Sequence, residues 1–234
     1  NQSSTSKIMA NFGQLVLVLG DLHIPDRASK IPAPFQKMLV PNKMQHVICT
    51  GNISSQDYAE LKALSPNVHV VAGDYDVGGD SNGDMLFPES RVVQVGNFSL
   101  GVIHGHQILP WQSKEALERT RRKLNVDILV TGHSHQNEVS VQEEDSYYHI
   151  NPGSITGAPS AAAAASAFNK EEAAAASSVI VPSFILLAVQ EAKVVCYVYE
   201  LVDGQVQVSK TEFTKKNNEH DDPEKKAALV ANAA

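Results

Sequence analysis

Seven side chains of the kinds that bind divalent metal ions occur in five short motifs of this sequence. The motifs are GDLH (20–23), TGN (50–52), GDYD (73–76), HGH (104–106) and GHSH (132–135). The candidate ligands are Asp21, His23, Asn52, Asp74, His104, His133 and His135. Imidazole and carboxylate ligands together suit Zn²⁺ or Mn²⁺, whereas structural zinc fingers need cysteine thiolates. The motifs therefore predict a centre for one or two divalent ions, with Zn²⁺ or Mn²⁺ as the cofactor.

Each motif follows a run of apolar residues that predicts a buried strand. The runs are LVLVL, HVIC, VHVV, LGVI and DILV. In α/β sheets, functional side chains gather at the carboxyl ends of the strands, and the glycine in each motif lets the chain turn there. A single histidine at a strand end is more often an ordinary surface residue. Five such motifs in succession favour one shared site.

The order of the predicted elements indicates an α/β fold with two sheets. Strands over 15–19, 46–49 and 68–71 alternate with helices over 35–39 and 57–64, as in a parallel sheet. Further along, we predict a hairpin of strands 91–95 and 99–103, a helix over 114–124 and a strand over 127–131. We assign a second sheet to strands 140–150, 184–189, 194–201 and 205–211. Helices outside two sheets give a four-layer α/β/β/α sandwich.

One domain accounts for most of the chain. We predict a flexible lead-in over 1–13, a single domain over 14–216 and a flexible, charged and Ala-rich tail over 217–234. The Ala-rich stretch 158–178 has no amphipathic stripe, and we interpret it as an inserted surface loop that leaves the metal motifs intact.

Charge and composition exclude some classes of function. The formal net charge of −7 argues against nucleic acid or an anionic membrane as a partner. No stretch reaches the ~20 apolar residues of a membrane span. Cys49 and Cys196 lie in apolar runs and predict buried, reduced thiols. We expect a cytoplasmic protein that reaches a membrane only through its partners.

The motifs resemble the calcineurin-like metallophosphoesterase superfamily, whose pattern is D-x-H, GD, GN-H/D, H and GHxH. The resemblance spans roughly 15–214, apart from the Ala-rich stretch. It implies that Asp21, His23 and His135 hold one metal ion. It also implies a second group for the other ion, formed by Asp74, His104 and His133.

Three residues depart from the superfamily pattern. Asn52 stands where the superfamily has a bridging aspartate, Asp74 where it has asparagine, and Tyr75 where many members have the histidine that protonates the leaving group. A neutral amide cannot offset the repulsion between two cations. A phenol with an ordinary pKa near ~10 is a poor general acid at neutral pH. The pattern therefore predicts no catalytic residues and a protein that is not an enzyme, with weak phosphoesterase activity left open.

A closer resemblance is to the metallophosphoesterase-like subunits of the retromer complex. It rests on LVLVLGDLHIP, VICTGN, GDYD, GVIHGHQILPW, VDILVTGH, INPGS and VPSFILL. The resemblance implies a non-catalytic scaffold in endosome-to-Golgi or plasma-membrane cargo retrieval. It also implies that the metal-site face binds the helical solenoid of the vacuolar protein sorting 35 subunit, at the endosomal membrane.

Two apolar surfaces are candidates for partner binding. The first, beside the metal site, comprises Ile108, Leu109, Pro110 and Trp111. Alternatively, Trp111 caps the helix that follows. The second matches positions where retromer regulators or sorting nexin-type proteins dock, and comprises Leu15, Phe35, Met38, Leu186, Tyr197 and Tyr199. Core packing is the alternative for each of these.

Two other functions fit the motifs. The ligand set also suits a Mn²⁺- or Zn²⁺-dependent phosphodiesterase of the small bacterial type, and a structural pocket without metal is the third possibility. Outside the pattern, we interpret His106 and His149 as structural histidines. Asp76 is either a hydrogen-bond partner of a ligand histidine or a solvated loop carboxylate.

Overall fold

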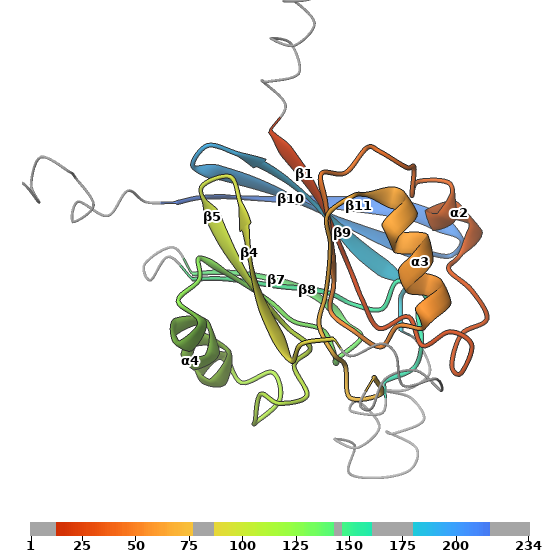
Figure 1. Ribbon diagram of the computed structural model, residues 1–234, viewed down its shortest axis with the longest axis horizontal. Helices are drawn as coiled ribbons and strands as arrows, with labels where there is room; N and C mark the ends of the chain where they lie inside the picture. Colours follow the sequence, from red (N-terminus) through yellow and green to blue (C-terminus); the bar gives the residue numbers. More distant parts are fainter. Residues whose placement is uncertain (1–12, 77–86, 143–146, 161–179, 216–234) are drawn as a thin grey trace, which may run out of the picture.

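In the described part of the chain, two β-sheets face each other, with three helices on their outer sides (Figure 1). The computed structural model describes residues 13–76, 87–142, 147–160 and 180–215. The first sheet contains β1 (Gln14–Leu19), β2 (His46–Cys49), β3 (Val68–Val70), β9 (Ser183–Gln190), β10 (Lys193–Val202) and β11 (Gln205–Thr214). The second contains β4 (Ser90–Val95), β5 (Phe98–Ile103), β6 (Ile128–Val130), β7 (Asn137–Gln142) and β8 (Tyr147–Pro152). The helices are α2 (Ala33–Gln36), α3 (Ser55–Leu64) and α4 (Lys114–Leu124). The predicted sandwich is confirmed.

The first sheet has the strand order β11-β10-β9-β1-β2-β3. Strands β1, β2 and β3 are parallel, and β9 pairs antiparallel with β1 from Gln14↔Val189 to Val18↔Ile185. Our assignment of strands 184–211 to the second sheet is therefore wrong. Since β2 occupies only one edge of β1, the other edge needs a hydrogen-bonding partner, and β9 supplies it.

The second sheet has the strand order β4-β5-β6-β8-β7, with β5, β6 and β8 parallel. The single strand predicted over 140–150 is wrong, because β7 and β8 are two antiparallel strands in the register Val139↔Ile150. The polar residues EEDS (143–146) between the two strands are the boundary signal that our prediction overlooked.

Strand β1 is buried on both faces, which explains its uninterrupted apolar run. Val16 and Val18 pack in the core between the sheets, whereas Leu17 and Leu19 pack in the core beneath α2 and α3. All four side chains are fully buried. A strand covered on both faces needs apolar residues at every position, so this strand could be predicted from the sequence.

Helices α3 and α4 begin at side chains that cap their first turns. Ser54 accepts from the backbone N–H of Asp57, and the Asp57 side chain accepts in return from the backbone N–H of Ser54. Ser113 caps α4, and Asn125 ends it in a left-handed conformation. Of the residues described, no helix combines the length and the apolar character required to cross a membrane.

His149 is a buried structural histidine on β8, as predicted. Its Nε2 lies 2.8 Å from Thr131 Oγ1, and its Nδ1 has no hydrogen-bond partner in the described part of the chain. Burial lowers the pKa of His149 to about 4. The side chain therefore stays neutral in the folded protein at pH values where it is protonated in the unfolded chain.

We predict that His149→Gln makes the protein less sensitive to mild acid. A folded pKa below the unfolded value means that stability is lost as pH falls from about 6.5 towards 4. Between pH 7 and pH 5 the wild type should lose about 1–2 kcal/mol more than the variant in free energy of unfolding. Urea unfolding at the two pH values measures the difference. Equal losses in the two proteins would contradict a neutral, buried His149.

Candidate metal centre

The carboxyl ends of five strands bring all seven predicted ligands to one place between the sheets. Asp21 and His23 follow β1, Asn52 follows β2 and Asp74 follows β3. From the second sheet, His104 follows β5, and both His133 and His135 follow β6. The first sheet thus contributes the carboxylates, and the second contributes most of the imidazoles.

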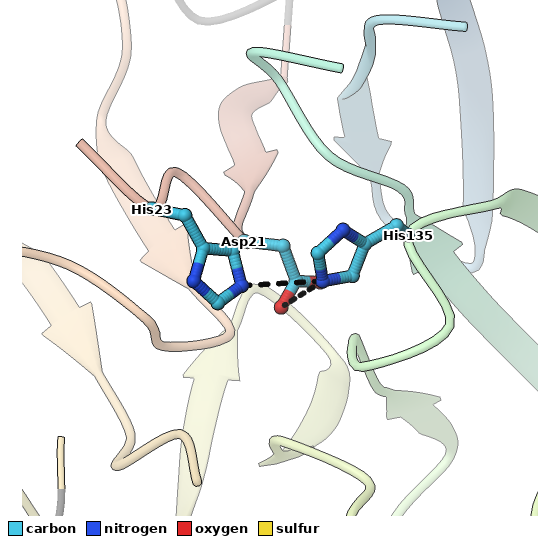
Figure 2. A group of neighbouring side chains, drawn as sticks. All are labelled: Asp21, His23 and His135. Carbon is cyan, nitrogen blue, oxygen red and sulfur yellow. Dashed lines mark hydrogen bonds and ion pairs between the residues drawn. The ribbon is translucent and has the colours of Figure 1, made fainter. Parts of the chain in front are cut away.

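Asp21, His23 and His135 form the first of two ligand groups, and all three are buried (Figure 2). Their side chains point towards one another, with Nε2 of His23 3.2 Å from Nε2 of His135. Asp21 Oδ1 lies 3.7 Å from Nε2 of His135. Burial and the neighbouring His135 lower the pKa of His23 to about 4. His23 is therefore neutral and has a lone pair available at neutral pH.

Asp74, His104 and His133 form the second group. Asp74 Oδ1 lies 3.0 Å from His104 Nε2, and Asp74 Oδ2 lies 3.8 Å from His133 Nδ1. In both groups, the potential ligand atoms lie within 4.8 Å of one another. The two groups are those that the superfamily resemblance implied.

Asp74 and His104 shift each other's pKa through their hydrogen bond and their charges. Burial alone would raise the pKa of Asp74, but hydrogen bonds from His104, His133 and Asn52 hold it far below its ordinary value. Burial likewise opposes a charge on His104, yet the Asp21 and Asp74 carboxylates raise its pKa overall. The pocket is therefore shaped to hold positive charge among its carboxylates.

Backbone carbonyls fix the orientation of two ligand histidines. His104 Nδ1 donates to the Thr50 carbonyl at 2.7 Å, and His135 Nδ1 donates to the Ala158 carbonyl at 2.6 Å. Since a carbonyl only accepts, the Nδ1 of each ring carries a proton and Nε2 faces the pocket. This is the arrangement that orients histidine for a metal ion.

Asn52 occupies the middle of the pocket, but its nitrogen faces the ligands. Nδ2 lies 3.3 Å from Asp21 Oδ1 and 3.1 Å from Asp74 Oδ1. It also lies 3.1 Å from His23 Nε2 and 3.2 Å from His104 Nε2. The amide oxygen points away and accepts from the Tyr75 backbone N–H at 3.1 Å. The sequence predicted the position of Asn52 but not this orientation.

The backbone around the pocket adopts conformations that are rare for residues other than glycine. Five of the seven predicted ligands have positive φ, namely Asp21 (50°), His23 (47°), Asn52 (57°), His133 (70°) and His135 (60°). Gly132 is required because a Cβ there would lie 2.8 Å from Asp21 Oδ2 and 2.5 Å from Thr50 Oγ1. Such strain is typical of functional sites.

Asp76 holds two of the motifs together, a role that neither of our interpretations included. Its carboxylate accepts from the backbone N–H groups of Asn52 at 2.6 Å, Ile53 at 3.1 Å and Gly73 at 2.8 Å. Burial raises the pKa of Asp76 in spite of these donors. The second aspartate of GDYD is the signal that could have indicated a loop-to-loop connection.

Residues at the start of the Ala-rich stretch support the site. Ala158 is buried and accepts from His135, and the Pro159 carbonyl accepts from Arg27 Nη1 at 3.0 Å. Ser160 Oγ donates to the His133 carbonyl at 3.3 Å. We predicted a surface loop from residue 158 onwards, but Ala158 and Ser160 are buried. The contact of Ala158 uses its backbone carbonyl, which every residue has, so the sequence could not indicate it. Residues 161–178 lie outside the described part.

The rim of the pocket carries large exposed side chains. Leu109 is 67% exposed, Tyr75 58% and Trp111 43%. The Trp111 ring lies 5.0 Å from the His133 ring, and its Nε1 donates to the His106 carbonyl at 3.2 Å. Trp111 does not cap α4, because Ser113 does so. Trp111 instead contacts a ligand histidine.

The structure separates Ile108 from its neighbours in the predicted rim. Ile108 is 6% exposed and packs with Ala116, Leu117 and Leu129 beneath α4. It is therefore unable to contact a partner directly, because α4 covers it. His106 lies beside the second ligand group, with its ring 5.4 Å from the ring of His104.

The second predicted surface lies on the outer side of β1, β9 and β10. Leu15, Leu186, Tyr197 and Tyr199 are partly exposed, as is Met38 after α2. Phe35 is fully buried and packs edge-on against Phe184, with ring centroids 4.8 Å apart. Phe35 therefore belongs to the core beneath this surface, and its prediction as a surface residue is wrong.

The residues present fit a divalent ion. His104 and His135 present Nε2 to the pocket, and His133 has its Nδ1 on the side of Asp74, 3.8 Å from Oδ2. Asp21, His23 and His135 would hold one ion, and Asp74, His104 and His133 the other. Such an ion would act as a Lewis acid towards a phosphoryl oxygen. Asn52 would first have to turn its oxygen inwards.

Comparisons with known proteins agree with this geometry. Residues 15–172 match the calcineurin-like phosphoesterase superfamily domain. Vacuolar protein sorting-associated protein 29 of Schizosaccharomyces pombe is 37% identical over 202 residues, covering 86% of this chain and 98% of that protein. A structure of vacuolar protein sorting 29 from Cryptosporidium parvum is 42% identical with a TM-score of 0.74, covering 88% of this chain and all of that one. Wild-type Vps29 from Entamoeba histolytica complexed with Zn²⁺ is 38% identical with a TM-score of 0.72, covering 86% of this chain and 100% of that chain.

The chain belongs to the calcineurin-like phosphoesterase superfamily. Within that superfamily it is a homologue of vacuolar protein sorting-associated protein 29, or Vps29.

We predict that Asp76→Asn destabilises the protein by about 2–4 kcal/mol, because hydrogen bonds to a charged acceptor contribute ~1.5–3 kcal/mol each and the amide offers one oxygen instead of two. The free energy of unfolding in urea measures the loss. Asp203→Asn, in the exposed turn between β10 and β11, is the control and should leave that free energy unchanged. A similar small effect of both changes would disprove the role of Asp76.

Proposed function

We propose that this protein is a non-catalytic scaffold subunit of the retromer, which binds the vacuolar protein sorting 35 subunit through its metal-site face. In this role it takes part in retrieving cargo from endosomes to the Golgi or the plasma membrane. It reaches the endosomal membrane through that complex. The homology to Vps29 supports the assignment to the retromer.

The proposal that the protein is not an enzyme rests on the position of Asn52. Its neutral amide stands between the two ligand groups, where the superfamily has a carboxylate that both ions share. Two cations held close together repel each other unless an anion lies between them. The general acid is also missing, because the exposed phenol of Tyr75 stands where many members place an imidazole. Both features of two-metal hydrolysis are therefore weakened.

The rim supports a partner on the metal-site face. Leu109, Pro110 and Trp111 are exposed, and Trp111 reaches over His133. On the opposite side of the pocket, Tyr75 lies between His23 and Arg27, with the guanidinium 4.4 Å from its ring centroid. Aromatic and aliphatic side chains around a pocket are typical anchors of an interface. A helical solenoid lying across this face would cover the pocket.

The outer surface of β1, β9 and β10 is the second proposed interface. Its apolar members are partly exposed, and they are Leu15, Met38, Leu186, Tyr197 and Tyr199. Val208 of β11 pairs with Tyr199 and is 52% exposed on the same side. Retromer regulators or sorting nexin-type proteins are the partners we propose for it.

A Zn²⁺- or Mn²⁺-dependent phosphodiesterase is the second candidate function. The observation in its favour is that both ligand groups are assembled, with histidine orientations suited to a metal. A predicted phosphoesterase from Streptococcus pneumoniae shares the fold at 14% identity and a TM-score of 0.56, covering 85% of this chain and 98% of that one. At that identity only the fold is comparable.

We predict that Leu109→Asp abolishes binding to the vacuolar protein sorting 35 subunit, because a charged group would be buried at the interface. The affinity should fall at least about 100-fold in calorimetry with the purified subunit. Val92→Asp is the control, since Val92 of β4 is apolar, 52% exposed and outside both proposed interfaces, and it should bind like the wild type. If Leu109→Asp binds normally while folded, the metal-site face is not the interface.

We also predict that turnover of an activated aryl phosphodiester with added Mn²⁺ stays close to the background rate, since the bridging anion is missing. The same assay with His104→Ala gives the baseline for a disrupted second ligand group. Rates well above background that disappear in His104→Ala would establish the phosphodiesterase instead.

A further inference from the structure

Asn52 has an amide whose two ends face different chemical surroundings. Around the nitrogen lie the two carboxylate oxygens of Asp21 and Asp74, at 3.3 and 3.1 Å. Around the oxygen lies the Tyr75 backbone N–H, at 3.1 Å. Reversing the amide would set its oxygen against two anions and its NH₂ against another donor. Without a metal ion, the two carboxylates and the Tyr75 N–H therefore all favour the orientation with the nitrogen inwards.

A metal ion requires the opposite orientation. Cations bind the oxygen of an amide and are repelled by its NH₂ group. For Asn52 to act as a ligand, Oδ1 must turn into the pocket, and the Tyr75 N–H then loses its acceptor. The Asp76 carboxylate holds the N–H groups of both Asn52 and Gly73, which opposes a backbone movement that would restore an acceptor to Tyr75.

Gly73 shows how closely the amide oxygen is packed against the GDYD loop. A Cβ at Gly73 would lie 2.2 Å from Asn52 Oδ1 and 2.7 Å from its Cγ. The amide therefore packs directly against the backbone of that loop. A turn of the amide changes its contact with the backbone N–H of Tyr75, whose ring forms part of the rim.

We propose that Asn52 is a two-position group: its NH₂ takes the place of a cation when the pocket holds no ion, and its oxygen turns inwards, releasing the Tyr75 N–H, when an ion binds. In the ion-free pocket the NH₂ compensates the two carboxylates, so the fold does not depend on metal. Metal binding then loosens the Tyr75 side of the rim. This coupling between metal binding and the rim at Tyr75 is a property of the pocket itself and does not depend on which partner covers it.

A bridging aspartate could not behave in this way. A carboxylate has two acceptor oxygens, so one could bind the ion while the other kept the Tyr75 N–H. Without an ion, however, it would add a third negative charge beside Asp21 and Asp74. Asn52→Asp should therefore convert a metal-independent fold into a metal-dependent one.

Thermal unfolding of wild type and Asn52→Asp, with chelator and with Zn²⁺ alone, tests the first half of the proposal. We expect Asn52→Asp to melt several degrees below the wild type in chelator. It should gain far more than the wild type from Zn²⁺, with Zn²⁺ affinity at least about tenfold higher. Equal melting temperatures in chelator, or an equal gain from Zn²⁺, would overturn the proposal.

Asn151→Asp is the matched control, since Asn151 is also buried and donates to the Gly132 carbonyl at 3.0 Å and to Ser134 Oγ at 3.0 Å. Losing those donors should lower the melting temperature equally with chelator and with Zn²⁺. A Zn²⁺-dependent rescue as large as that of Asn52→Asp would show that any added carboxylate near the site is sufficient, and would refute a specific role for Asn52.

Amide hydrogen exchange in the wild type tests the second half and does not depend on any variant folding. On saturation with Zn²⁺, the Tyr75 N–H should exchange about five- to tenfold faster, because it has lost its acceptor. The Gly73 N–H, bound to Asp76, should not change and serves as the internal reference. Unchanged or slower exchange at Tyr75, with Zn²⁺ binding demonstrated by the histidine resonances, would disprove the turn of the amide.

Discussion

The structure of the pocket depends on how two carboxylates are compensated where the sheets meet. Asp21 is fully buried and Asp74 partly so, and both point at the same few atoms. Two buried anions this close would be unstable without positive or donating partners. The imidazoles of the second sheet and the NH₂ of Asn52 provide those partners. The two sheets are thus joined at this edge by electrostatics as well as by the apolar core.

That arrangement is compatible with a metal-type pocket that also forms part of the proposed docking surface. Two of the four candidate ligand histidines, His104 and His135, are oriented by backbone carbonyls, so the fold itself fixes their positions. Trp111 packs on His133, and Tyr75 packs on His23. Each ligand group therefore has an aromatic side chain of the rim in contact with it. The pocket forms the floor of the proposed interface and fixes the aromatic side chains that a partner would contact.

The motifs predicted much of this from the sequence, and the errors have physical causes. Buried strands such as β1 could be predicted from the sequence, because a strand covered on both faces needs apolar residues at every position. The pairing of β9 with β1 could not be predicted, since either sheet could have accepted an apolar strand. Burial of Phe35 and Ile108 depended on neighbours distant in the chain. The support from Ala158 and Ser160 comes from a stretch whose composition indicated only a loop.

The sequence by itself determined the superfamily, the seven candidate ligand positions and the amide in place of the superfamily's bridging carboxylate, because each of these is a matter of side-chain identity after a strand. The tertiary structure decided how those side chains are turned. The NH₂ of Asn52 faces inwards because it donates to Asp21 and Asp74, which follow two different strands. The amide oxygen faces the other way because it accepts from the Tyr75 N–H. Hydrogen-bond direction is set by neighbours that only folding brings together, so no residue pattern could have shown it.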